Sequence, residues 1–135
     1  MAEWYEGTVL LDVSPGEAGE LDRAMLERLG HPVIVCHGPA DKELCPLLGG
    51  QGCQKFDRAH GIVFRLDLDR PQHRAILLRY RKLARPDMPI RAHVTPEQTE
   101  RYADLLGDLE IWTHEPTVAD FDGFAARVEA ADRPA

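Results

Sequence analysis

The chain has 135 residues, the length of one ordinary domain, of which 44% are hydrophobic and 29% charged. These fractions exclude a disordered or low-complexity chain, and no apolar run approaches the roughly 20 residues that span a bilayer. A net charge of −7 argues against a nucleic-acid surface, which needs clustered Lys and Arg. Because the first residues also lack the basic and apolar segments of a secretory signal, we expect a cytoplasmic protein with no membrane partner.

Short apolar runs recur along the chain and predict five strands. Each run is rich in aliphatic or β-branched residues and is bounded by Gly, Pro or polar residues. The runs cover residues 8–11, 32–36, 61–66, 89–94 and 109–112.

Four of these runs are followed by a helix-start signal and then by apolar residues at helical spacing. The expected capping residues are Ser14, Asp69, Thr95 and Thr117, the first three standing one or two residues before a Pro. The expected buried stripes are Leu21, Met25 and Leu29; Ile76, Leu77, Tyr80 and Leu83; Tyr102, Leu105 and Leu106; and Phe121, Phe124, Ala125 and Val128.

Strands that alternate with helices predict βαβ units, which form a parallel sheet with helices on both faces. The sequence therefore predicts a single three-layer α/β domain over residues 1–135. One link is irregular, because residues 37–60 hold several Gly and Pro and two cysteines where a second full helix is expected. A loop this long in a compact domain is usually functional. We expect no more than short helical turns there, near residues 41–44 and 55–59.

Four polar residues stand at the carboxyl ends of the predicted strands: Asp12, Asp67, Thr95 and Glu115. With Asp67 four residues before Pro71, this order resembles the receiver domain of bacterial response regulators. The resemblance implies a flavodoxin-like doubly wound sheet of order 2-1-3-4-5, here with helix 2 replaced by the Cys/Gly-rich loop. It also implies a pocket lined by these four residues, with Asp67 as the phospho-acceptor position and Thr95 as the switch residue.

Two residues depart from the family pattern. Val13 stands where the second acidic residue would be, and Glu115 stands where the family has a Lys. Phosphoryl transfer to a carboxylate needs a divalent cation and a positive group, and both are weakened here. We therefore expect a degenerate, stand-alone receiver-like module for regulation or protein interaction that ordinary aspartyl phosphorylation does not switch. An enzyme acting beside Asp12 and Asp67 has less support, since both Asp67 and Asp69 are also placed to cap the following helix.

By the same resemblance, a protein partner or a second copy in a homodimer would bind the region from Pro96 to Ala131. A second charged feature lies on the predicted helix after residue 70, where Arg74, Arg81 and Arg85 repeat along one face. We interpret it as a solvated outer face, with a docking stripe for an acidic partner as the alternative.

The irregular segment carries Cys36, Cys45 and Cys53 at the spacing C-x8-C-x7-C. Three interpretations stay open. The thiolates form a zinc site with His37 or His60 as the fourth ligand. Alternatively, Cys45 and Cys53 form a reversible disulfide with Cys36 as a third thiol, in a thiol-redox sensor. Otherwise all three simply pack as small hydrophobic residues. We predict that the three cysteines lie close together in space, as either of the first two interpretations requires.

The histidines outside this segment show no spacing typical of a site. We expect His73, in the first turn of a helix, to be exposed to solvent, and His93 to be hydrogen-bonded at the edge of the core. His114 precedes Glu115 at the pocket end of the fifth strand.

Overall fold

The computed structural model describes residues 7–13, 19–38, 45–50 and 52–132. Its five strands form one parallel sheet in the order β2-β1-β3-β4-β5, which confirms the predicted flavodoxin-like α/β fold. The strands are β1 (Val9–Val13), β2 (Val33–Cys36), β3 (Gly61–Arg65), β4 (Ile90–His93) and β5 (Glu110–Trp112).

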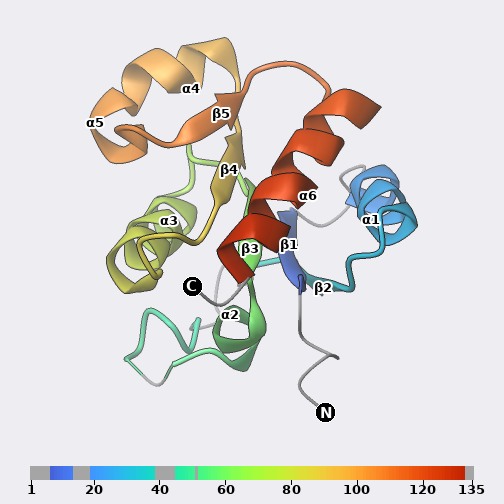
Figure 1. The fold of residues 1–135 in the computed structure, drawn as a ribbon. Helices are drawn as coiled ribbons and strands as arrows, with labels where there is room; N and C mark the ends of the chain where they lie inside the picture. The colour runs from blue at the N-terminus through green and yellow to red at the C-terminus, as the bar shows by residue number, and fades with distance from the viewer. Residues whose placement is uncertain (1–6, 14–18, 39–44, 51, 133–135) are drawn as a thin grey trace.

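Six helices of the described chain flank this sheet. Figure 1 shows α1 and α6 on one face and α3 on the other, with α4 and α5 together beside β5. Within the described ranges, no helix is long and apolar enough to cross a membrane. The helices are α1 (Gly19–Arg28), α2 (Gln54–Arg58), α3 (Pro71–Leu83), α4 (Pro96–Arg101), α5 (Ala103–Leu106) and α6 (Val118–Asp132).

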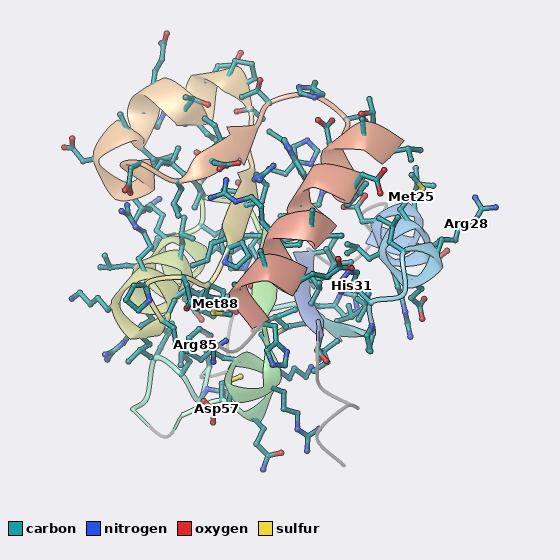
Figure 2. All side chains as sticks on the ribbon, in the orientation of Figure 1. Met25, Arg28, His31, Asp57, Arg85 and Met88 are labelled. Atoms are coloured by element: carbon teal, nitrogen blue, oxygen red, sulfur yellow. The ribbon has the colours of Figure 1, made fainter. Side chains whose placement is uncertain are left out.

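The sheet separates two apolar layers, because successive residues of a strand point to opposite faces. In β1, Val9 and Leu11 pack towards α1 and α6, whereas Leu10 packs towards α3. The four predicted core residues of α6 are all buried, as are Ile76, Leu77 and Tyr80 of α3. His31 lies between α1 and α6, where its ring contacts the Glu129 carboxylate (Figure 2).

Two predicted core residues are instead exposed. Leu21 is 63% exposed because α1 turns Asp22 and Leu26 inwards, and Leu21 lies roughly 140° around the helix from Leu26. Leu83 is 52% exposed because α3 ends at this residue and no described residue covers it. Helical periodicity identified the two helices, but the buried Asp22 sets the orientation of α1.

The helix caps were predicted correctly at two positions. The Gln98 N–H donates to Thr95 Oγ1 at 3.1 Å while the Thr95 N–H donates to Gln98 Oε1 at 3.2 Å, which forms a capping box. Thr117 and Asp120 exchange the same pair of bonds at the start of α6. The predicted cap at Ser14 lies outside the described residues, as does the turn expected at residues 41–44.

Asp69 does not cap α3, so the prediction of a cap at this residue is wrong. The N-cap position belongs to Arg70, and no side chain caps the helix there. The Asp69 carboxylate instead accepts hydrogen bonds from Arg101 and from the Tyr102 hydroxyl, both at 2.8 Å. These contacts join the start of α3 to the end of α4.

The solvated-face interpretation of α3 is wrong for two of its three arginines. Arg74 donates to the Leu68 carbonyl at 2.8 Å and to the Tyr102 hydroxyl at 3.3 Å. Arg81 donates to the Leu105 carbonyl and to Asp108. Both side chains therefore fasten α3 to α4 and α5, and only Arg85 is largely exposed.

Candidate functional site

The carboxyl ends of the strands border two cavities, which are lined by three of the four residues of the predicted pocket, and Glu115 lines neither. Asp12 lines the first cavity, on the α3 side of β1 and β2. Asp67 and Thr95 line the second, at the ends of β3 and β4. The structure therefore brings Asp67 and Thr95 together but does not place Asp12 with them.

The first, here called the cysteine cavity, has a volume of about 560 Å³. It is lined by Cys36, Cys45 and Cys53 together with Asp12, Lys55 and Tyr80. The three cysteines thus gather at one place, although all three are free. They share the lining of one cavity, but among the described residues they form neither a disulfide nor a cluster that could hold a metal, so their close approach stays a prediction.

The irregular segment creates this cavity. β2 ends at Cys36, which is in register with Asp12 on β1, so both side chains lie at the same edge of the sheet. The next helix, α2, has only five residues, and Cys53 occupies its N-cap position. Phe56 of α2 stacks on the Tyr80 ring at 5.3 Å between centroids, but five residues cannot pack as broadly as a full helix. A space therefore remains above the carboxyl ends of β1 and β2.

The floor of the cysteine cavity carries a fully buried acid. Asp12 has no exposed surface, and within the described ranges neither carboxyl oxygen has a hydrogen-bond partner of good geometry. Burial raises the pKa of Asp12 to about 7, against the opposing effects of the nearby Tyr80 hydroxyl, Cys36 thiol and Lys55 ammonium. At neutral pH this carboxyl group therefore holds its proton for much of the time.

The same surroundings shift the pKa values of the groups next to Asp12. Burial, followed by the charge of Asp12, raises the pKa of the Cys36 thiol. The same two causes raise the pKa of the Tyr80 hydroxyl. Cys36 is therefore a neutral thiol at physiological pH, with little of the thiolate that reacts or binds metal.

The predicted histidine ligands are not part of this cluster. The His37 ring lies 3.1 Å from the Val13 carbonyl oxygen, to which it donates. His60 precedes β3 at the opposite, amino-terminal edge of the sheet, where its Nδ1 accepts a hydrogen bond from the Thr8 N–H. In the described part of the chain, no three His, Cys, Asp or Glu residues are grouped as a metal site requires. The zinc site stays a prediction without structural support.

The second, here called the edge cavity, has a volume of about 570 Å³ and contains the predicted phospho-acceptor position. Asp67 Oδ1 accepts hydrogen bonds from the Asp69 N–H at 3.0 Å and from Gln98 Nε2 at 3.1 Å. Gln98 is the partner of Thr95 in the capping box. Asp67 and Thr95 are therefore linked through Gln98, in a network that holds the start of α4 against the turn after β3.

Arg65 is the residue of this region that the sequence analysis missed. It is the last residue of β3, in register with Val13 on β1. Its guanidinium donates to Asp22 at 2.6 Å and to Glu115 at 3.3 Å. Burial raises the pKa of Asp22, and Arg65 opposes that shift. An Arg inside an otherwise apolar strand signals a buried charge that needs partners, and that signal was present in the sequence.

Arg65 also changes the chemistry of the edge cavity. The resemblance predicted a pocket of acidic residues without the Lys that the family carries. The structure instead shows a cation at the end of β3 that is paired with Asp22 and with Glu115. His93 lines the same cavity, and burial together with Arg65 lowers its pKa. Its buried Nδ1 has no partner among the described residues, so the expected hydrogen bond of His93 is not confirmed at this atom.

Two other histidines are held by local contacts. His73 is 2% exposed, contrary to expectation, because its Nδ1 turns inwards to accept a hydrogen bond from the Asp67 N–H. His114 lies on the surface, where its ring contacts Asp120 at 3.2 Å. Neither ring lines the edge cavity.

Comparisons with known proteins give a match in fold alone. No family model matches the chain, and no curated protein matches it. A solved structure described as a sensor protein from Polaromonas sp. JS666 is similar to it, with a TM-score of 0.57 and 15% sequence identity. The match covers 93% of this chain and 94% of the other.

Proposed function

We propose that this protein is a receiver-like regulatory module that acts by binding another protein and is not switched by aspartyl phosphorylation. The flavodoxin-like strand order and the similarity in fold to a structure titled a sensor protein support the receiver-like part. The residues at the strand ends support the absence of phosphorylation, since Arg65 pairs with Glu115 and the Asp67 carboxylate is bound to Asp69 and Gln98.

The distribution of charge is the observation that carries the binding role. Residues 96–131, the proposed partner region, contain nine acidic and two basic residues, which gives −7. The whole chain also has a net charge of −7, so the rest of it is neutral. An acidic face of this kind accelerates association with a partner of opposite charge and selects against partners of like charge.

Three acids of this region project from α4 and α5 with no ion pair in the described chain. Glu97, Glu100 and Asp104 are all exposed, and they follow one another at intervals of three and four residues. Neighbouring acids such as Asp108 and Glu110 are paired with arginines. The face defined by these three residues, here called the acidic face, therefore keeps its charge available. A partner with a basic surface fits it better than a second copy of this chain, because a twofold dimer would place the same acids against each other.

The partner is first isolated by cross-linking it to a reactive group placed at position 104. Its affinity for the natural chain and for two variants is then measured. The triple variant Glu97→Gln, Glu100→Gln, Asp104→Asn should weaken that affinity at least about tenfold and flatten its dependence on salt. The matched control removes three exposed acids elsewhere, by Glu20→Gln, Glu27→Gln and Asp57→Asn, and should bind as the natural chain does. Equal loss in both triple variants, or a salt-independent affinity, would refute the proposed face.

A thiol-dependent sensor is a second candidate function, favoured by the convergence of Cys36, Cys45 and Cys53 on one cavity. In the redox form, hydrogen peroxide would oxidise two thiols to a disulfide with release of two waters. Peptide mapping under mild peroxide tests this, and a disulfide between two of these cysteines is the supporting result. Metal analysis of protein purified without a metal column tests the zinc form. Three unmodified thiols and no bound metal would leave packing as their role.

A further inference from the structure

The cysteine cavity has a feature that the proposed function does not use, namely the unpartnered carboxyl group of Asp12. The side chain is fully buried and lines the cavity, and neither oxygen has a hydrogen bond of good geometry in the described part of the chain, although the Tyr80 hydroxyl and the Cys36 thiol lie close enough to lower its pKa. A buried polar group without a partner destabilises a fold by about 1–3 kcal/mol. Native structures keep few such groups, and those they keep usually have a role.

The rest of the cavity suits an apolar molecule. Leu47, Leu66 and Ile76 form part of its wall, along with Tyr80. Its volume of about 560 Å³ falls within the roughly 300–1,000 Å³ that is usual for small-molecule sites. An apolar cavity with one or two convergent polar groups is also the usual composition of such sites.

The donors that already line the cavity indicate which charge the head group of a ligand should carry. Among the described lining residues Lys55 is the one cation, and its Nζ donates to the Val35 carbonyl at 3.0 Å. The Tyr80 hydroxyl and the thiols are neutral donors, and thiols are weak ones. A carboxylate has about four acceptor positions and bonds most strongly to a charged N–H donor. An ammonium or amidinium group is therefore the complement of Asp12.

We propose that the cysteine cavity binds a small organic cation, with its nitrogen head paired to Asp12 and its apolar body packed against Leu66 and Ile76. This site contains no residue of the acidic face, so its test is independent of the test of the proposed function. The three cysteines are then part of the wall of a ligand site. Their thiols fill space beside the body of the ligand.

The electrostatics of the site make this binding depend on pH. The charged and titratable groups facing Asp12 are Tyr80, Cys36, Cys53 and Lys55. Because the Asp12 carboxyl is largely protonated below neutral pH, a cation binds weakly there. Affinity rises as the pH passes through about 7 and stays high until the amine itself loses its proton.

Three probes that share one phenyl ring and a short chain test the head group: 2-phenylethylamine, 2-phenylethanol and 3-phenylpropionate. Their affinities for the full chain are measured by chemical-shift titration. The amine should bind at least about tenfold more tightly than the alcohol, and the carboxylate should not bind. Cys36 and Cys53 give a second readout in the natural chain, since the bound amine should slow their alkylation by iodoacetamide.

Two variants locate the site. Asp12→Asn removes the charge at constant shape and should reduce amine binding to the level of the alcohol. Asp57→Asn makes the same chemical change on the exposed face of α2 (Figure 2) and should have no effect. Equal binding of the three probes, no amine binding at millimolar concentration, or full amine binding by Asp12→Asn would each overturn the proposal. If Asp12→Asn does not fold, the alkylation rates of the natural chain decide, and an amine that leaves them unchanged also overturns it.

Discussion

Arg65, at the end of β3, donates a hydrogen bond to Glu115, in the segment after β5, across 3.3 Å. The same guanidinium holds Asp22 of α1 at 2.6 Å. One cation thus connects three segments that are distant in the sequence, at the edge of the sheet where receiver domains are expected to carry out phosphoryl chemistry. Arg65 thus adds a positive charge to the cavity that Asp67 lines, and its partner Glu115 carries a negative charge where the family has a Lys.

The first prediction is that small phosphodonors leave no acyl phosphate on Asp67. Its Oδ1 already accepts two hydrogen bonds, the position of the second acid is Val13, and Glu115 would repel an aspartyl phosphate. Intact mass measured after incubation with acetyl phosphate and magnesium should be unchanged, while an active receiver treated in parallel gains a phosphoryl group. A mass increase that disappears in Asp67→Asn would show that the site works.

The second prediction concerns the stability that Arg65 supplies. Arg65→Ala should lower the free energy of unfolding by about 3–5 kcal/mol, because it leaves the Asp22 carboxylate buried without its cation. Chemical denaturation measures the change. Arg23→Ala is the control, since the Arg23–Glu27 pair is 52% exposed on both sides and should contribute less than about 1 kcal/mol.

A double variant separates the charge effect from simple loss of packing. Adding Asp22→Asn to Arg65→Ala removes the unpaired charge and should restore part of the lost stability. If the double variant loses as much stability as Arg65→Ala and Asp22→Asn lose together, the ion pair between these two residues does not stabilise this edge of the sheet.

The fold was predictable because local signals and global topology agree in this chain. Thr95 with Gln98 and Thr117 with Asp120 start helices directly after apolar strands, so the βαβ order and the parallel sheet follow from neighbouring residues. The resemblance then supplied the strand order. The buried stripe of α6 was correct at every position, since that helix packs on the sheet along most of its length.

The site was less predictable, because its geometry depends on residues far apart in the sequence. Arg65 finds its partners 43 and 50 residues away, and no local pattern indicates that choice. Asp12 was identified as a strand-end acid, a position that is usually open to solvent. It is instead fully buried beside a cavity that residues distant in the sequence, among them Cys45 and Tyr80, also line, and spacing alone does not determine that arrangement.

The third prediction tests the role of Thr95 as the N-cap of α4. Thr95→Ala removes one bond of the capping box and should lower the free energy of unfolding by about 1 kcal/mol. Thr95→Ser keeps the hydroxyl and should retain most of that stability. A methyl-specific effect, in which Ser is as destabilising as Ala, would show that Thr95 acts by packing and not as a cap.

The fourth prediction is that Cys36 reacts slowly with alkylating reagents at neutral pH. Burial and the neighbouring Asp12 charge raise the pKa of this thiol, and only the thiolate is an efficient nucleophile. Mass spectrometry after timed iodoacetamide treatment should find Cys36 labelled far more slowly than in the unfolded chain. Rapid labelling of folded Cys36 at pH 7 would mean a reactive thiolate and would favour the redox-sensor interpretation.

The fifth prediction is that Asp12 makes the protein less stable as the pH rises from about 4 to about 7. The pKa of Asp12 is 3.8 when unperturbed and about 7 in the folded protein, so between these values the folded state binds more protons than the unfolded state. The free energy of unfolding therefore falls with rising pH across this window and is level above it. His93, whose pKa is lowered, acts in the opposite direction just below its ordinary value of 6.5, so the effect of Asp12 must be isolated by comparison.

Asp12→Asn provides that comparison, because an amide does not titrate. Its stability relative to the natural chain should increase with pH through this window and reach a gain of about 2–4 kcal/mol at pH 8. Denaturation series at several pH values measure the difference, and Asp57→Asn, which changes an exposed acid, should show no such slope. A constant difference between Asp12→Asn and the natural chain from pH 4 to pH 8 would mean that Asp12 is ionised throughout, and that the cavity stabilises its charge by contacts other than those described.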